Sequence, residues 1–345
     1  MQKPVILFGG QSYEHEISIV SAIALHRVLT QACEFVFLSP DRRFYHIDLI
    51  DMKADHFASG RYRKNTELFL SRGGFEKKSL FGRTAFDGDV VISTVHGGDG
   101  EDGKLAALFD FYGVPYVGPR LEASVLSFNK QLTKHLGQMA GVKTLPYEVV
   151  RRGETITLPY PYILKPLRLG SSIGVSVVRS DQERDYALDV AFEFDSEVLA
   201  EPFISGVKEY NLAGCRAGNE WQLSLIEEPA KKELLDFDQK YLDFARTGKA
   251  CEADLTPSTA DAVREAFKKV YAQGFDGALI RCDFFIIDGE VYLNEVNPVP
   301  GSLANYLFEN YEATLNSLIA ALPQPRQIPV SYHYIHSIRS AKGKL

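Results

Sequence analysis

Residues 281–301 read RCDFFIIDGEVYLNEVNPVPG, and this stretch decides both the fold and the chemistry expected of the chain. Two apolar runs flank an Asp-Gly pair, which predicts a β-hairpin. Acidic and amide side chains interrupt these runs, and a core strand tolerates such groups only where they are paired or bind a metal. Asp283, Glu295 and Asn297 supply the hard oxygen ligands that Mg²⁺ prefers. The stretch therefore predicts a metal site.

The register of this hairpin determines whether the ligands converge, because side chains alternate between the two faces of a strand. A two-residue loop would pair Ile287 with Glu290 and place the two acids on opposite faces. A three-residue loop, with its glycine in a left-handed conformation, would pair Ile286 with Glu290 and place Arg281 opposite Glu295. The metal hypothesis therefore predicts the odd-length loop. A plain edge hairpin with a solvated face is the alternative.

The composition is that of an ordinary globular protein. The 345 residues suggest two or three domains, and 45% hydrophobic with 24% charged residues are ordinary values for a buried core. A net charge of −7 argues against a general nucleic-acid binder. No apolar run is long enough to span a membrane, and the four scattered cysteines form no CxxC pair. We therefore expect a cytoplasmic protein without nucleic-acid or membrane partners.

The pattern of elements predicts an α/β fold in which residues 1–121 form a mainly parallel sheet, because buried strands alternate with amphipathic helices there. The strands expected in this block are residues 4–8, 35–38 and 90–94, and the helices are residues 17–29 and 104–112. Residues 122–200 form a second block, with a helix at 129–140 and strands at 162–165 and 175–178. In a third block, residues 201–322, Ser258 and Asp261 resemble a capping box that begins a helix. Residues 323–345 are expected to be a peripheral tail.

Two glycine-containing segments suggest sites for charged ligands. KPLRLGSSIGVSVV (165–178) places a lysine before a Gly/Ser loop whose backbone N–H groups can approach phosphates, although a plain hairpin would also explain it. GGQSYEHEIS (9–18) follows a strand and opens a helix, which is an anion-binding geometry. Glu14 and Glu16 would repel phosphate, however, and suit a cationic amine better. A helix-capping cluster is the alternative.

Three further segments are consistent with ligand binding. HGGDGEDG (96–103) permits close backbone approach, and a protonated His96 would meet a carboxylate. Residues 201–204 would border an adenine site, with Glu209 reaching ribose hydroxyls. DQKYLD (238–243) would form a lid. Taken singly, the first segment is equally well explained by a glycine-rich turn, and the other two are better explained by an ordinary strand pair and a surface loop.

Together, the order and spacing of these segments resemble the D-alanine–D-alanine ligase family of the ATP-grasp superfamily, from residue 5 to about residue 308. The motifs that carry the resemblance are GGxSxEHExS, HGxxGEDG, KPxxxGSSxGVS, KYLD and DFF…NExNPxPG. The resemblance implies a three-domain ATP-grasp fold with ATP between the central domain (122–200) and the C-terminal domain (201–322). It also implies a homodimer in the bacterial cytoplasm that makes D-alanyl-D-alanine for peptidoglycan synthesis.

The resemblance further implies a mechanism and a set of site residues. The carboxylate of one D-alanine attacks the γ-phosphate of ATP, and the amine of a second D-alanine attacks the resulting acyl phosphate. The implied catalytic residues are Glu14, Ser171, Tyr241, Arg281 and Gly301, and those near the substrates are Glu14, His96, Arg281, Ser302 and Tyr306. The implied ATP-binding residues are Lys130, Lys165, Ser171, Ser172, Glu201, Phe203, Ile204, Glu209, Lys240, Phe285, Asn294 and Glu295. Two Mg²⁺ ions, replaceable by Mn²⁺, would bind Asp283, Glu295 and Asn297.

Two departures from the family pattern affect these roles. Many members carry a serine that contacts the second carboxylate where this chain has Tyr306, so Ser302 is a rival for that contact. A lysine often follows the adenine-site glutamate, but here the residue is Pro202, which has no N–H. Adenine contacts are therefore expected from the Pro202 carbonyl, Phe203 and Ile204. Tyr241, at the lid position, favours an amine nucleophile over a hydroxyl one.

Three alternative functions remain open from the sequence. Another ATP-grasp ligase would join a different carboxylate and amine. A non-catalytic nucleotide-binding protein on the same fold would have lost metal ligands or lid residues, and this chain retains both. An NAD-dependent oxidoreductase is disfavoured because the glycine spacing is not that of a dinucleotide-binding loop.

Overall fold

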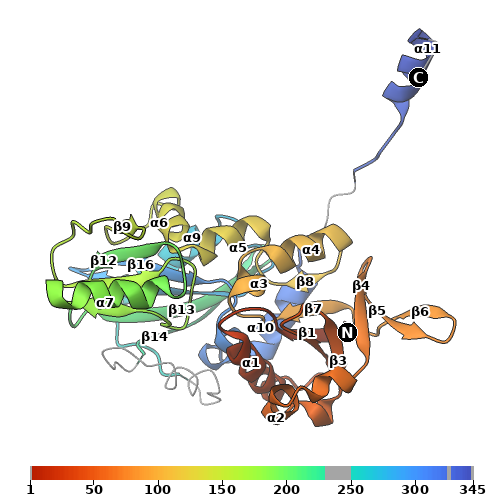
Figure 1. The fold of residues 1–345 in the computed structure, drawn as a ribbon, viewed down its shortest axis with the longest axis horizontal. Helices are drawn as coiled ribbons and strands as arrows, with labels where there is room; N and C mark the ends of the chain where they lie inside the picture. Colours follow the sequence, from red (N-terminus) through yellow and green to blue (C-terminus); the bar gives the residue numbers. More distant parts are fainter. Residues whose placement is uncertain (1, 230–249, 325–327, 343–345) are drawn as a thin grey trace.

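The computed structural model describes residues 2–229, 250–324 and 328–342. Over these residues the chain forms three β-sheets with helices packed around them (Figure 1). The strand orders are β6-β5-β4-β3-β2-β1-β7-β8, β11-β10-β12-β9 and β14-β13-β15-β16. The expected α/β class is therefore confirmed.

The first sheet is mixed rather than parallel throughout. Its parallel part consists of β1 (Pro4–Gly9), β2 (Glu34–Leu38), β7 (Val90–Ser93) and β8 (Tyr116–Val117). These strands are short apolar runs, as expected where both faces of a sheet are covered. An antiparallel arm extends the sheet through β3 (Phe44–Ile47), β4 (Glu67–Ser71), β5 (Gly74–Ser79) and β6 (Gly82–Ala85). The mainly parallel sheet predicted from the sequence is thus limited to β2-β1-β7-β8.

The helices of this block follow the predicted apolar spacing. The helix that leaves β1 spans two residues more at its start than predicted, and the helix expected at 104–112 is confirmed. The helices are α1 (His15–Val28), α2 (Ala54–Ala58), α3 (Gly98–Glu101) and α4 (Lys104–Tyr112), with short 3-10 turns at Leu49–Asp51 and Arg61–Lys64. Both α1 and α3 begin where a buried parallel strand has just ended, which brings their N-termini to one edge of the sheet.

The second sheet is antiparallel and has α7 (Asp181–Phe192) packed against it (Figure 1). Its strands are β9 (Glu148–Val150), β10 (Tyr162–Pro166), β11 (Ser176–Val178) and β12 (Val198–Pro202). It is preceded by α5 (Leu121–Phe128) and α6 (Lys130–Met139), and the Asn129 side chain caps α6 by accepting hydrogen bonds from two backbone N–H groups. Strand β12 runs across the domain boundary predicted between residues 200 and 201.

The third sheet carries the hairpin that opened the sequence argument. Its strands are β13 (Lys208–Ala217), β14 (Glu220–Glu227), β15 (Ile280–Ile287) and β16 (Glu290–Asn297), accompanied by α9 (Pro257–Tyr271) and α10 (Tyr311–Ala320). The capping box predicted at Ser258 is wrong. Thr256 caps α9 instead, its hydroxyl accepting from the Thr259 N–H at 3.2 Å, because Pro257 occupies the first turn.

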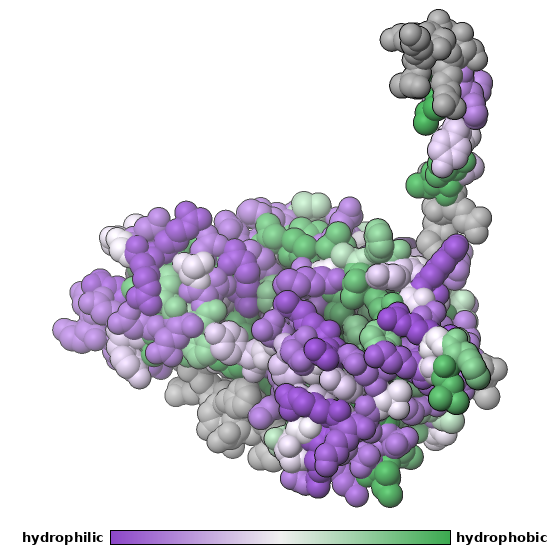
Figure 2. Space-filling view, turned by 45° about the vertical axis from the view of Figure 1, so that its right-hand side comes forward, coloured by the Kyte–Doolittle hydropathy of each residue, from purple (hydrophilic) through white to green (hydrophobic). Residues whose placement is uncertain are grey.

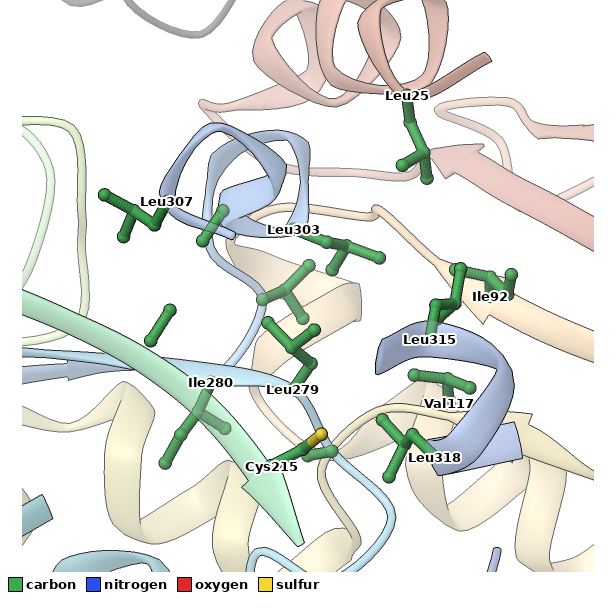
Figure 3. Close-up of a cluster of buried hydrophobic side chains, with 14 of the residues drawn as sticks. Leu25, Ile92, Val117, Cys215, Leu279, Ile280, Leu303, Leu307, Leu315 and Leu318 are labelled. Carbon is green, nitrogen blue, oxygen red and sulfur yellow. The ribbon is translucent and has the colours of Figure 1, made fainter. Parts of the chain in front are cut away.

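One hydrophobic core joins the first and third sheets. The 3-10 turn η3 (Gly301–Leu307) follows β16, and its Leu303 and Leu307 are buried in this core (Figure 3). Leu25 of α1 and Leu315 of α10 belong to the same core (Figure 3). The turn after the β15–β16 hairpin is therefore held between N-terminal and C-terminal elements.

The last described segment stands apart from the body (Figures 1 and 2). It contains α11 (His333–Lys342) and exposes apolar side chains, among them Ile328 and Val330. Among the described residues, no helix has the length and apolar character needed to cross a bilayer.

Candidate active site

The hairpin turn differs from the one that the metal hypothesis required. Ile287 pairs with Glu290 across a two-residue Asp288-Gly289 turn, so the predicted three-residue loop is wrong. Both turn residues have positive φ, 51° and 78°, which is the conformation that an Asp-Gly pair favours in a tight hairpin. The local preference of Asp-Gly therefore sets the loop length.

A β-bulge nevertheless brings the acids to one face. Phe284 pairs with Leu293 but Asp283 pairs with Glu295, so Asn294 is an extra residue in β16. One inserted residue reverses the alternation of the strand beyond it. Asp283 therefore lies directly opposite Glu295, and Arg281 lies opposite Asn297 rather than opposite Glu295 as predicted.

Asp283 is the centre of a buried network. The Arg281 guanidinium donates to both of its oxygens, at 2.7 and 2.8 Å, and the Asn297 amide donates at 3.0 Å. A third Arg281 nitrogen lies 3.4 Å from the Tyr306 hydroxyl. Burial raises the pKa of Asp283, which the Arg281 charge opposes. Arg281 stays cationic, since nearby carboxylates raise its pKa although burial would lower it.

The donor set fits a hard cation. Asp283 and Glu295 contribute carboxylates from facing positions, and Asn297 turns its amide nitrogen to Asp283, which leaves its amide oxygen for a metal. Lys130 lies 3.7 Å from Glu295 and also donates to the Leu169 carbonyl at 2.8 Å. No group of three or more His, Cys, Asp and Glu with metal-binding geometry occurs among the described residues, so any metal here would rely on the Asn297 amide as well.

A second buried network lies on β10, β12 and α6. The Glu201 carboxylate accepts from Lys165 at one oxygen and from Lys134 at the other, the latter at 2.7 Å. Burial alone would raise the pKa of Glu201, but the two lysines lower it to about 2. Asn294, the bulge residue, links this network to Glu209, with contacts of 3.4 Å to Lys165 and to Glu209.

Lys134 is the residue of this network that the sequence argument missed. It is only 2% exposed, and its pKa is lowered by burial. A lysine four residues after Lys130, among the buried positions of an amphipathic helix, was the available signal.

One backbone donor at the predicted adenine site is already engaged. The Phe203 N–H donates to the Pro161 carbonyl at 3.0 Å, because the chain still pairs with β10 at this point. The contacts expected from the Pro202 carbonyl, Phe203 and Ile204 stay predictions, and any contact from Phe203 would use groups other than this N–H. Phe285 lies opposite Glu209 in the β13–β15 pairing, and Ser172 lies in the turn after β10 with φ of 56°.

Glu14 precedes α1 and is enclosed by the loop from the second sheet. Its Oε1 accepts a short hydrogen bond from the Ser171 hydroxyl. Its Oε2 is buried and has no hydrogen-bond partner among the described residues. A methyl group on Gly97 would lie 2.5 Å from Oε2 and one on Gly170 would lie 2.9 Å from Oε1, so only glycine lets the backbone approach. Burial raises the pKa of Glu14, and so does the nearby Glu101.

His96 is buried and neutral. Its Nε2 lies 2.8 Å from the Ser21 hydroxyl, and its Nδ1 lies 3.7 Å from Glu101. Burial lowers the pKa of His96 to about 4 and raises that of Glu101 to about 8, so the two groups form no ion pair at neutral pH. The protonated His96 suggested by the sequence is disfavoured in this fold, because burial lowers its pKa more than the nearby Glu14 raises it.

The predicted residues are thus gathered into three neighbouring groups. Arg281, Asp283, Glu295, Asn297 and Tyr306 form one, and Lys165, Glu201, Glu209 and Asn294 form the second. Glu14 with Ser171, and His96 with Ser21 and Ser302, form the third. Gly301 is buried at the start of η3. Lys240 and Tyr241 lie outside the described residues.

Comparison with known proteins shows the family to which the chain is similar. Residues 3–119 match the family described as D-ala D-ala ligase N-terminus, and residues 136–321 match D-ala D-ala ligase C-terminus. The chain is 58% identical to D-alanine–D-alanine ligase of Campylobacter concisus, covering 98% of each chain. It is 55% identical to the enzyme of the same name from Wolinella succinogenes, over 98% of this chain and 99% of the other.

The fold of the chain also matches that of solved D-alanine–D-alanine ligase structures. The crystal structure of D-alanine–D-alanine ligase from Helicobacter pylori superposes with a TM-score of 0.84 at 46% identity, over 94% of this chain and 100% of the other. The structure of the Bacillus anthracis ligase complexed with ATP is 20% identical and shows the same fold with a TM-score of 0.63. Given two family matches that together cover most of its length and relatives identical at more than half of its positions, the chain belongs to the D-alanine–D-alanine ligase family.

Proposed function

We propose that the chain joins two molecules of D-alanine with the energy of ATP and releases D-alanyl-D-alanine, ADP and phosphate. The observation that carries this proposal is Glu14, a buried carboxylate with one unpartnered oxygen among the described residues. A buried acid of this kind binds a cation most favourably, and an amino-acid ammonium is a cation with hydrogen-bond donors. Lys130 contacts both the loop that bears Ser171 and the acid Glu295, and so joins the amine site to the nucleotide site.

ATP would bind between the second and third sheets. Lys130 and Lys165, together with Lys240, would contact its phosphates, and Ser171 and Ser172 would present the loop to them. Glu201, Ile204 and Glu209 would contact adenine and ribose, with Phe285 and Asn294 beside them. Mg²⁺ held by Asp283, Glu295 and Asn297, as two ions that Mn²⁺ replaces, would supply positive charge against the phosphate oxygens.

The reaction would proceed in two steps. In the first, a carboxylate oxygen of D-alanine bonds to the γ-phosphorus as the bond to ADP breaks, while Glu14 holds the ammonium. In the second, the amine of another D-alanine, having lost a proton, bonds to the carbonyl carbon, and phosphate leaves. Arg281 and the Gly301 N–H would stabilise the tetrahedral oxyanion between these events. Tyr306 or Ser302 would receive the second carboxylate, and Tyr241 would complete the lid with Ser171 and Glu14.

The test is a screen of amino-acid pairs with purified protein, ATP and Mg²⁺, in which phosphate release and product mass are measured. D-Alanine alone should give the highest kcat/KM and a dipeptide product. Turnover with a different carboxylate and amine, but not with D-alanine, would identify another ligase of the same fold. ATP binding without turnover of any pair would identify a non-catalytic nucleotide-binding protein.

The assembly and the product's use belong to the same proposal. We expect a homodimer, which light scattering of the purified protein will measure. We also expect the dipeptide to supply peptidoglycan synthesis in the cytoplasm, so depletion of the protein in its host should deplete D-alanyl-D-alanine.

A further inference from the structure

The turn η3 has a backbone that its sequence alone would not adopt. Ser302, Leu303 and Ala304 have φ of 48°, 48° and 51°, and none of them is glycine. Left-handed conformations are unfavourable for residues with a Cβ, so the surroundings must hold these three in place. Leu303 and Ala304 are buried in the core shared by the first and third sheets, which supplies part of that support (Figure 3).

The polar support of the turn comes from α1. The Ser302 N–H donates to the Ser21 hydroxyl at 3.2 Å, across 281 residues of sequence. Ser21 is completely buried, so this bond has no competition from water. Within the turn, the Asn305 amide donates to the Ser302 carbonyl at 2.9 Å. Ser21 thus anchors the first left-handed residue of the turn to the N-terminal block.

The same hydroxyl also contacts His96. Ser21 Oγ lies 2.8 Å from His96 Nε2. Because a backbone N–H can only donate, Ser21 accepts from Ser302, and its own hydrogen or its second lone pair is available for His96. The other ring nitrogen of His96, Nδ1, lies 3.7 Å from Glu101. One serine therefore bridges the His96 ring and the backbone of η3.

We propose that Ser21 is a positioning residue for the second substrate, acting through the turn at Ser302 and the placement of the His96 ring. This inference rests on the proposed function, because it assigns the turn that follows Gly301 to the site where the second D-alanine binds. The hydrogen bonds of Ser21 described above involve neither the network around Asp283 nor the network around Glu201. Its loss should therefore alter the use of D-alanine and leave the use of ATP nearly unchanged.

Ser18 provides a matched control on the same helix. It is equally buried, donates to the Thr94 carbonyl at 2.6 Å and accepts from the Gly9 N–H at 2.8 Å. Ser18→Ala and Ser21→Ala thus each remove two buried hydrogen bonds from α1. A purely structural role for Ser21 would make the two variants behave alike.

The experiment compares Ser21→Ala and Ser18→Ala with the full-length wild-type protein. We expect Ser21→Ala to raise the KM for the second D-alanine about tenfold, the factor typical of one lost buried hydrogen bond, with the KM for ATP within about twofold. We expect Ser18→Ala to lower the melting temperature similarly but to keep the ratio of the two D-alanine KM values. Equal kinetic changes in both variants would overturn the inference.

A spectroscopic measurement tests the same inference without turnover. The ¹⁵N shifts of the His96 ring should be alike in the wild type and in Ser18→Ala, and should change in Ser21→Ala. Unchanged ring shifts in Ser21→Ala would overturn the role of Ser21. If the wild-type protein did not turn over D-alanine, the proposed function would fail, while the ring shifts would still decide whether Ser21 holds the His96 ring.

Discussion

Glu14 and Glu201 are both buried glutamates of the candidate site, but their pKa values shift in opposite directions. Two lysines hold the pKa of Glu201 at about 2, whereas burial raises that of Glu14. The fold therefore compensates the charge of Glu201 by itself and leaves an oxygen of Glu14 without a partner among the described residues. The difference teaches that the fold itself neutralises the surroundings of Glu201, whereas Glu14, in the proposed function, would be neutralised by the ammonium of the substrate.

The largest expected effect concerns Glu201, whose charge is compensated by two lysines. Glu201→Gln leaves Lys134 and Lys165 buried without their carboxylate, so we expect the free energy of unfolding to fall by about 3–5 kcal/mol. Urea denaturation measures it, with the exposed Glu193→Gln as control. Adding Lys134→Met to Glu201→Gln should recover part of the loss. If Glu201→Gln were as stable as the wild type, the network would not stabilise the fold.

The next effect concerns Arg281, which is compensated by Asp283 in the structure and is assigned to the oxyanion in the mechanism. Removing a single oxyanion donor lowers kcat by about 10²–10³-fold. We expect Arg281→Ala to show this loss in phosphate-release assays, with a much smaller change in ATP affinity measured by calorimetry. Near-normal turnover of this variant would contradict the assigned role.

The third prediction concerns Glu14, whose charge no lysine compensates by a described hydrogen bond. Glu14→Gln keeps the size of the side chain and an acceptor for Ser171 but removes the charge, so we expect kcat/KM for D-alanine to fall about 100-fold. Unlike Glu201→Gln, it should not lower the free energy of unfolding, because no buried cation loses its partner. A stability loss as large as that of Glu201→Gln would remove the distinction between the two glutamates.

The elements of this fold were predictable where one local pattern dominates. The apolar run 4–8 and the spacing of residues 104–112 gave a buried strand and a helix, both confirmed. The two-residue hairpin turn follows from the local preference of Asp-Gly, whereas the three-residue loop was inferred only from the metal hypothesis. The sequence sign of the β-bulge lies in β16, where the adjacent polar residues Asn294 and Glu295 break the alternation.

Other features depend on contacts that no local pattern contains. The left-handed turn at Ser302 has no glycine, and only its packing against α1 and the core explains it. The neutral state of His96 follows from complete burial, which its motif does not reveal. The antiparallel arm at residues 67–85 is largely polar and half exposed, so its strands lack the apolar runs by which strands are recognised. Sequence motifs thus indicate candidate site residues, but the charge states of these residues depend on burial, which the motifs do not reveal.

The last prediction is a pH dependence set by Glu101, whose change per pH unit is smaller than the effects above. Its pKa is raised from 4.5 to about 8 by burial, so between these values the folded protein keeps a proton that the unfolded chain releases. The contribution of Glu101 to stability therefore falls as pH rises through this window, by at most about 1.4 kcal/mol per pH unit. His96 has the opposite sign: its pKa of about 4 lies below 6.5, so its contribution to stability falls as pH drops below 6.5 and opposes that of Glu101 there.

Glu101→Gln separates these two contributions. It should flatten the fall in unfolding free energy between pH 6.5 and pH 8. Because the two contributions oppose each other between pH 4.5 and 6.5, the variant should also lose stability more steeply than the wild type as pH drops through that range. Urea denaturation at several pH values measures both, and the exposed Glu122→Gln serves as the control that should change neither. A variant that kept the full slope above pH 6 would show that Glu101 is ionised in the folded protein. The amine site would then hold two buried negative charges, and the ammonium of the substrate would have to offset Glu101 as well as Glu14.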